Sequence, residues 1–271
     1  MTIHPRVCLH QVAFASESTT AFVDHCRAIG MPNVTLVTPI LMQPGGVEEA
    51  RRALAEGGPK AAVINHPIAM GASLDRVGSE ETQKLQQAVD IAAALGAPVI
   101  YLVSGGRGSL LWEDAAERFA ELIAPCLPSA RENGVQITVE SASPLNADMH
   151  IAHTLDDTIR LAGVAGIGVC IELNACWYEA NLKDKFRRAM PLTALVQVSD
   201  YVLGDRFTPN RAVPGDGVVP LEWLLGTLLD LGYAGVFDLE LVGPRIEQEG
   251  PRAASRRSAE YLSEILVKLG A

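Results

Sequence analysis

The sequence predicts an α/β fold, a single (β/α)8 TIM barrel over residues 1–271, from three observations. Short apolar runs alternate with helical patterns along the chain, which favours a parallel sheet covered by helices. Eight such runs occur and seven of the gaps between them hold helical signals, giving one β unit per roughly 34 residues. The 48% hydrophobic content over 271 residues is enough for one large core.

The expected strands are short segments rich in Val, Ile and Leu, as buried parallel strands require. They cover residues 7–14, 33–39, 61–68, 97–105, 135–141, 167–174, 192–200 and 236–243. An open, doubly wound sheet is the alternative fold. It is disfavoured because the first strand runs into SESTTAF and not into a Gly-x-Gly-x-x-Gly turn.

Helices are expected between these strands. Residues 80–95 place apolar side chains on one face, and Gly96 follows as a stop signal. Residues 112–133 also have a helical pattern, but Pro125 and Pro128 lie inside it. Proline removes a backbone donor and clashes with the preceding turn, so this helix should kink or split.

Charge and cysteine content restrict the class of protein. The net charge is −10 and the 22 basic residues are scattered, which disfavours nucleic-acid and membrane-surface partners. The five cysteines have no Cys-x-x-Cys spacing, which argues against a disulfide framework and a structural zinc site. The N-terminal residues have no apolar segment of signal-peptide length. We therefore expect a cytoplasmic protein.

Four oxygen-bearing side chains occur at similar depth near the ends of successive strands in the second half of the chain. They are Glu140, Glu172, Gln197 and Glu240. In a barrel the chemistry lies at the carboxyl ends of the strands, where three carboxylates would repel one another unless they were protonated, paired with Arg or Lys, or bridged by a divalent cation. Oxygen ligands suit Mg²⁺ or Mn²⁺, so we expect such an ion. Taken singly, each could instead be a rim residue or a hydrogen-bonded core amide.

Other polar and aromatic residues follow the strands. His10 and His66 are candidates for substrate contact, with a hydrogen-bonded structural role as the alternative. Trp177 follows the sixth strand and could wall a pocket or pack on the barrel. His150 and His153 fall in the loop after the fifth strand and are expected at the surface.

Two loops have features of anion sites. The glycine-rich stretch GGRGS, residues 105–109, looks like a phosphate cradle, although a lone glycine loop is a weak signal. The loop at residues 203–217 carries Arg206 and Arg211, which could hold a phosphate or carboxylate. Its alternative role is a turn that positions the next helix.

Several stretches together resemble the xylose isomerase-like TIM barrels, the sugar phosphate isomerase/epimerase superfamily. The stretches are ARENGVQITVES (130–141), GVCIELNACW (168–177), LVQVSD (195–200) and NRAVPGDGVVPLEWLLGTLLDLGYAGVFDLEL (210–241). The last is the most specific, with Pro-Gly-x-Gly, a helix, Gly-Tyr-x-Gly and a strand ending in Glu. The resemblance is clear over roughly residues 90–245 and elsewhere rests on the pattern of elements.

The resemblance implies roles for individual residues. Glu140 and Glu240 match metal ligands that also act as the acid and base in isomerases and epimerases. Glu172 matches a ligand position that is usually Asp, and Gln197 one that is usually His, although some dehydratases of the superfamily have Gln there. Arg211 matches an arginine that anchors substrate. The Gln replacement removes an imidazole and favours Mg²⁺ or Mn²⁺ over Zn²⁺, and the Glu replacement moves the carboxylate out by one methylene.

One departure concerns the sixth strand. The epimerases carry Asp-x-x-His there, whereas this chain reads Glu-Leu-Asn-Ala at residues 172–175, so the histidine is missing. Asn174 in this segment is a candidate for substrate binding. The resemblance implies a metal-dependent sugar or sugar-acid isomerase or epimerase that acts by proton abstraction and a metal-stabilised enediolate. The alternatives are a metal-dependent dehydratase (a lyase) on a keto-polyol or dehydroshikimate-like acid, and a non-catalytic ligand-binding barrel.

The expected partner is a small-molecule polyol, keto-sugar or keto-acid. Copies of the chain could form a homo-oligomer, as relatives often do, but the sequence shows no interface.

Overall fold

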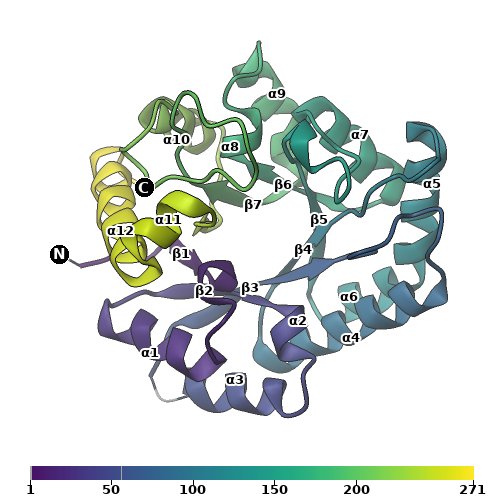
Figure 1. The fold of residues 1–271 in the computed structure, drawn as a ribbon, viewed down its shortest axis with the longest axis horizontal. Coiled ribbons are helices and arrows are strands. Elements are labelled where there is room, and N and C mark those ends of the chain that lie inside the picture. Colours follow the sequence, from purple (N-terminus) through teal and green to yellow (C-terminus); the bar gives the residue numbers. More distant parts are fainter. Residues whose placement is uncertain (1, 56) are drawn as a thin grey trace. The chain divides into compact units, whose positions relative to one another are not determined.

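A computed structural model describes residues 2–55 and 57–271. Eight parallel strands close into a barrel in the order β1 to β8, which confirms the predicted (β/α)8 TIM barrel (Figure 1). The strands are β1 (Val7–His10), β2 (Asn33–Val37), β3 (Lys60–Pro67), β4 (Val99–Val103), β5 (Gln136–Glu140), β6 (Gly168–Glu172), β7 (Thr193–Val198) and β8 (Phe237–Leu239).

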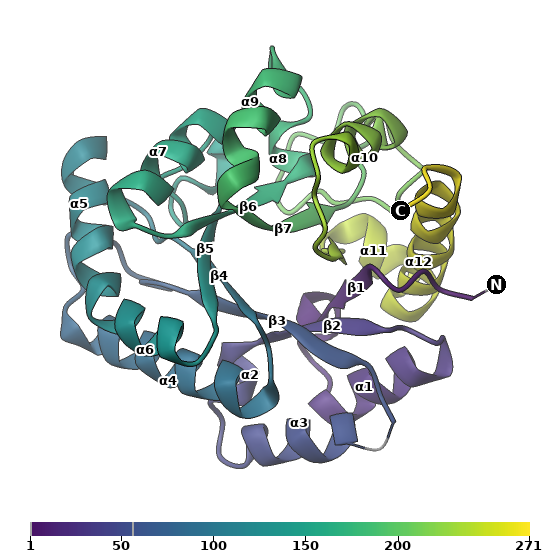
Figure 2. The same ribbon diagram turned by 180° about the vertical axis from the view of Figure 1, so that it is seen from behind.

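Helices connect the strands and flank them (Figure 1 and Figure 2). The α-helices are α1 (Thr19–Ala28), α2 (Thr38–Leu41), α3 (Gly46–Ala55), α4 (Ser79–Leu95), α5 (Trp112–Ile123), α6 (Leu127–Glu132), α7 (Leu155–Ala165), α8 (Leu173–Cys176), α9 (Leu182–Ala189), α10 (Leu221–Asp230), α11 (Pro244–Glu249) and α12 (Pro251–Lys268). Short 3₁₀ helices are η1 (Gln11–Phe14), η2 (Ala124–Cys126), η3 (Pro144–Asn146) and η4 (Met190–Leu192).

The chain divides into two compact units. Unit 1 comprises Met1–Ala62 and Val196–Ala271, and unit 2 comprises Val63–Leu195. In unit 1, α1 packs on α3, and α12 packs on β1 and β8. In unit 2, α5 packs on α4 and α7, and α7 also packs on β5 and β6. The expectation of one domain over residues 1–271 stays a prediction.

The strands hold much of the core, as their apolar runs predict. Every residue of β1, β2, β6 and β8 is buried. A parallel strand is covered on one side by barrel-interior side chains and on the other by helices, which explains why these strands are apolar without alternation. Polar residues inside them therefore need a specific explanation.

Local signals set the helix ends. The Ser18 hydroxyl accepts a hydrogen bond from the Ala21 amide at the start of α1, and Thr154 does the same for the Asp157 amide at the start of α7. Helix α4 ends on Gly96, which has a φ of 70°, a left-handed conformation that glycine adopts without strain. These caps fix where each βα loop begins and ends.

The structure corrects some predicted boundaries. The predicted strand over residues 7–14 ends at His10, because the His10 side chain accepts a hydrogen bond from the Val12 amide and starts η1. The predicted strand over residues 236–243 covers only Phe237–Leu239. The proline-containing helix over residues 112–133 splits as expected, into α5, η2 and α6.

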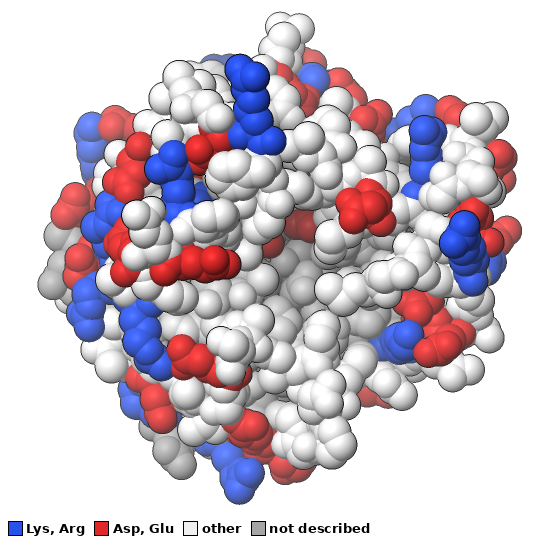
Figure 3. Space-filling view, viewed as in Figure 1, with Lys and Arg blue, Asp and Glu red and all other residues white. Residues whose placement is uncertain are grey.

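Charged residues of both signs are interspersed on the face drawn in Figure 3. Many of them are paired, for example Arg257 with Asp216 and Glu249, and Arg245 with Asp205. Among the described helices, none combines the length and apolar character that crossing a membrane requires.

Candidate functional site

Unit 2 carries two of the predicted ligands, each as the last residue of its strand. Glu140 ends β5 and is 6% exposed, and Glu172 ends β6 and is 1% exposed. One Glu172 carboxylate oxygen accepts a hydrogen bond from the Asn174 amide at 3.0 Å. Burial of a carboxylate is unfavourable unless hydrogen bonds or a positive charge compensate it. Each of these two buried glutamates therefore needs such a partner.

His150 contacts Glu140, and the prediction of a surface histidine is wrong for it. Its Nε2 lies 3.4 Å from Oε1 of Glu140, and the two side chains are 5% and 7% exposed. His153, three residues on, is only half-buried, and its Nδ1 lies 3.1 Å from the Ala142 carbonyl oxygen. A carbonyl oxygen only accepts, so Nδ1 of His153 carries the proton in this contact.

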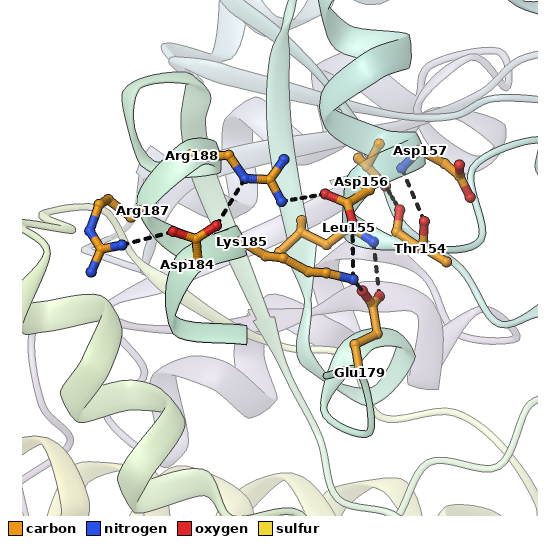
Figure 4. Close-up of polar contacts among 10 residues, drawn as sticks. Thr154, Leu155, Asp156, Asp157, Glu179, Asp184, Lys185, Arg187 and Arg188 are labelled. Atoms are coloured by element: carbon orange, nitrogen blue, oxygen red, sulfur yellow. Dashed lines mark hydrogen bonds and ion pairs between the residues drawn. The ribbon is translucent and has the colours of Figure 1, made fainter. Parts of the chain in front are cut away.

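The loop after β6 carries Asn174 and Trp177. Asn174 lies in α8 and is 6% exposed, and the Trp177 ring meets that of Tyr178 edge-on at 5.9 Å. Just beyond them Glu179 ties this loop to the start of α7 (Figure 4). Glu179 accepts the Leu155 amide at 2.8 Å and the Lys185 ammonium at 2.6 Å.

The rest of this network lies closer to solvent. Lys185 also reaches Asp156 at 3.1 Å, and Asp184 accepts hydrogen bonds from Arg187 and Arg188 (Figure 4). The Glu179 side chain is only 6% exposed, whereas those of Asp184 and Arg187 are more than half exposed. The buried part of the network therefore positions the loop, and the exposed part contributes little.

His66 lies in β3 and is 2% exposed. Burial lowers its pKa to about 4; the nearby Glu81 acts in the opposite sense and Lys84 in the same sense. The ring is therefore neutral at pH 7 and offers one donor and one acceptor nitrogen.

Unit 1 holds Gln197 in a polar region of buried strands. Gln197 in β7 is fully buried and stands in register with Asp238 in β8, which in turn stands in register with Cys8 in β1. The Cys8 Sγ lies 3.4 Å from the Thr35 hydroxyl. Burial raises the pKa of Asp238 above its ordinary value.

Glu240 follows β8 directly and forms an ion pair. Its Oε2 accepts a hydrogen bond from Nη2 of Arg211 at 2.9 Å, and the side chains are 12% and 10% exposed. Both residues were expected at the site, one as ligand and base and the other as substrate anchor. The structure brings them together in a nearly buried charge pair.

Asp200 holds the loop that presents Arg211. One carboxylate oxygen accepts the amides of Tyr201 and Val219, and the other accepts those of Gly215 and Gly217, at 2.8–3.0 Å. Backbone hydrogen bonds between Asp200 and Ala212 fix the residue next to Arg211. The sequence signal for this role is the aspartate at the end of LVQVSD together with the following Pro-Gly-Asp-Gly turn.

His10 ends β1 and is 1% exposed. Its Nδ1 accepts the Val12 amide at 2.9 Å. In the neutral ring the proton therefore lies on Nε2, which makes that nitrogen the donor.

The last residue of the glycine-rich stretch after β4 binds a carboxylate of the chain itself. Asp75 accepts hydrogen bonds from the Ser109 amide at 3.0 Å and from its hydroxyl at 2.7 Å. A Cβ on Gly108 would collide with this carboxylate, and hydrogen bonds from Ser73 and Ser109 lower the pKa of Asp75. The stretch thus holds one of the chain's own carboxylates through Ser109, and its role as a phosphate cradle stays a prediction.

The side chains proposed as ligands fit a hard divalent cation by their chemistry. They supply carboxylate and amide oxygens; Glu140, Glu172 and Gln197 are buried, and the Glu240 side chain is 12% exposed. Within residues 2–55 and 57–271, no three His, Cys, Asp or Glu side chains are grouped so as to hold a metal ion. The carboxylates are engaged with His150, the Asn174 amide and Arg211. A cation at Glu240 would compete with the Arg211 guanidinium.

These features define an α/β barrel with buried carboxylates where successive strands end. The family model of the xylose isomerase-like TIM barrel matches residues 23–265, and the chain belongs to that family. A search of curated proteins found no significant match to the sequence.

Solved structures share this fold at low sequence identity. A Sinorhizobium meliloti protein has a TM-score of 0.86 and 23% identity over 96% of this chain and 98% of its own. The D-psicose 3-epimerase of Clostridium cellulolyticum, solved with D-tagatose, has a TM-score of 0.79 and 13% identity over 97% and 99%. The probable 3-DHS dehydratase AsbF of Bacillus anthracis has a TM-score of 0.74 and 14% identity over 95% and 98%.

Other similar structures contain metals or have a different activity. The IolI protein was solved with a zinc atom, and a xylose isomerase-like protein of Mycobacterium smegmatis was solved with magnesium. An AP endonuclease of family 2 from Brucella melitensis also has a similar fold. Divalent metals thus occur among similar structures, and at these identities the likeness to this chain is one of fold.

Proposed function

We propose that the protein is a divalent-metal-dependent isomerase or epimerase of a small polyol, keto-sugar or keto-acid. One observation carries the proposal: a member of this family has buried glutamates at the ends of β5 and β6, a fully buried glutamine in β7, and a glutamate directly after β8 whose side chain is 12% exposed. The cation would be held by Glu140, Glu172, Gln197 and Glu240. When bound, it would act as a Lewis acid on the substrate carbonyl.

The chain's own residues would carry out the proton transfer. Glu140 or Glu240 removes the proton from the carbon α to the carbonyl, and the electron pair of the broken C–H bond forms the enediolate. Return of a proton to the opposite face of the same carbon gives the epimer. Return to the neighbouring carbon gives the isomer. Burial of both carboxylates keeps water away from the reacting carbon.

A dehydratase is the second candidate, and two residues favour it. Gln197 stands where some dehydratases of the superfamily have glutamine, and Asn174–Ala175 replace the segment that ends in histidine in epimerases. In this reaction the same enediolate expels the β-hydroxyl, which takes the proton from the protonated glutamate and leaves as water. The shared fold with AsbF supports keeping dehydroshikimate among the substrates to test.

We propose that five further residues bind the substrate: His10, His66, Asn174, Trp177 and Arg211. Their burial supports this role for the first three and for Arg211, whereas Trp177 is partly exposed. The proposed partner is a small molecule, because a chain with net charge −10 and paired basic residues is a poor match for a nucleic-acid backbone.

The test is solvent deuterium exchange followed by product analysis. Mn²⁺-loaded protein would be incubated in D₂O with ketoses, inososes and dehydroshikimate, and NMR would detect deuterium at the carbon α to the carbonyl. We expect exchange with at least one substrate class, abolished in Glu140→Gln or Glu240→Gln and retained in Glu113→Gln, a surface control. A dehydrated product would select the lyase. Exchange that survives in both active-site variants would contradict the proposal.

A further inference from the structure

The loop from Ser141 to Thr154 brings a histidine ring against the Glu140 carboxylate. The Nε2 of His150 lies 3.4 Å from Oε1 of Glu140, at the outer limit of a hydrogen bond, and both side chains are more than nine-tenths buried. A carboxylate only accepts hydrogen bonds, so this pairing requires the proton on Nε2 of His150.

The backbone on both sides of His150 is fixed by hydrogen bonds. The His150 amide donates to the Asn146 carbonyl at 2.9 Å. The next amide, that of Ile151, donates to the Ser104 hydroxyl at 3.0 Å, and the Ile151 carbonyl accepts from Nε1 of Trp112 at 2.7 Å. The two Ile151 contacts come from Ser104, the residue after β4, and from Trp112 at the start of α5, so the backbone beside His150 is held by residues outside its own loop.

Two further contacts close the loop around the histidine. The Ala142 amide donates to the Ala152 carbonyl at 3.0 Å, which joins the two ends of the loop. At Gly106 a Cβ would collide with the Asp148 carbonyl, so glycine is needed for the loop to approach the segment after β4 so closely. The glycine-rich stretch after β4 thus helps to seat the loop that carries His150.

We propose that His150 is a positioning residue that donates a hydrogen bond to Glu140 and fixes the orientation of this carboxylate for the divalent cation. The inference rests on the proposed function, since it concerns a proposed ligand. A carboxylate held in one orientation loses less rotamer freedom on binding a cation than a free one. Loss of such a supporting hydrogen bond typically weakens metal affinity by roughly 10–100-fold.

His153 provides a matched control. It belongs to the same loop and its ring also makes a polar contact, but to the Ala142 carbonyl and at partial exposure. A purely structural role of the loop histidines would therefore affect the fold in both variants. Only the positioning role predicts that metal affinity depends on His150 and not on His153.

The experiment measures Mn²⁺ affinity by electron paramagnetic resonance of free Mn²⁺, with thermal unfolding as a fold check. We expect roughly 10–100-fold weaker binding in His150→Phe. His150→Gln, which keeps an N–H donor, should recover part of the loss, and His153→Phe should stay within about twofold of wild type.

The outcomes separate the inference from the proposed function. Weakened binding in Glu140→Gln, together with wild-type affinity in folded His150→Phe and His150→Gln, would overturn the positioning role alone. Wild-type affinity in Glu140→Gln, or no Mn²⁺ binding by the wild type, would overturn the proposed function and the inference with it. If His150→Phe does not fold, the Mn²⁺ affinities of His150→Gln and His150→Asn are compared with that of His153→Phe instead. Affinities equal to that of the control would overturn the positioning role.

Discussion

The Arg211 guanidinium lies 2.9 Å from the Glu240 carboxylate, and both side chains are nearly buried. This pair joins the residue expected to anchor substrate with a residue expected to bind the cation. The guanidinium neutralises a carboxylate that would otherwise be buried without compensation, and it opposes a second positive charge there. Its removal should therefore affect metal and substrate binding in opposite directions.

Arg211→Met should bind Mn²⁺ roughly tenfold more tightly than wild type, because a competing positive charge is lost. The same variant should have a lower kcat/KM if Arg211 also contacts substrate. Calorimetric titration with Mn²⁺ and steady-state kinetics give the two values. Weaker Mn²⁺ binding in the variant would show that the arginine supports the cation and does not compete with it.

Asp200→Asn should destabilise the protein by about 3 kcal/mol, since an amide replaces a carboxylate that accepts four backbone hydrogen bonds. The loop over residues 201–219 should then become sensitive to limited proteolysis. Urea unfolding gives the free energy, and mass spectrometry locates the cleavage. Asp205→Asn, whose ion pair with Arg245 lies at the surface, is the control. Equal effects of the two substitutions would refute this role of Asp200.

Lys185→Met should cost about 2–3 kcal/mol of unfolding free energy, because it leaves the Glu179 carboxylate buried without its cation. Arg187→Met removes an exposed pair of the same network and should cost less than about 0.5 kcal/mol. Both variants can be compared by urea unfolding at pH 7. Similar costs would mean that the buried and exposed parts of the network contribute alike.

The low pKa of His66 predicts a dependence of stability on pH. The pKa of about 4 in the folded chain lies below the ordinary histidine value of 6.5. Between pH 4 and 6.5 the unfolded chain binds more protons than the folded chain. The stability that depends on the neutral His66 ring is therefore fully present above about pH 6.5 and is lost as the pH falls towards 4. The free energy of unfolding falls by about 3 kcal/mol over this pH range. In His66→Asn, unfolding free energies from pH 7 to 4 should fall less steeply than in wild type; parallel curves would contradict the assignment.

The fold was predictable because apolar runs and helix signals repeat along the whole chain. The strand ends were less predictable. Residues 11–14 are as apolar as a strand, but the hydrogen bond from the Val12 amide to the His10 ring turns the backbone into η1. Such a local side-chain contact leaves no trace in hydrophobic periodicity.

The candidate site was predictable at its strand ends and not in its loops. Glu140 and Glu172 end their strands as expected. The burial of His150 depends on Ser104 and Trp112, which lie 47 and 39 residues before Ile151. The ion pair of Arg211 and Glu240 likewise joins residues 29 positions apart. Contacts over such separations are set by the folded barrel, and no local pattern signals them.

The most direct measurement is the Mn²⁺ content of the protein after Mn²⁺ loading and dialysis, in wild type, Glu140→Gln and Glu240→Gln. We expect about one ion per chain in the wild type and less than about a tenth of that in each variant, since each loses a charged oxygen ligand. Content that stays the same in both variants, or no bound ion in the wild type, would contradict a metal centre built from these residues.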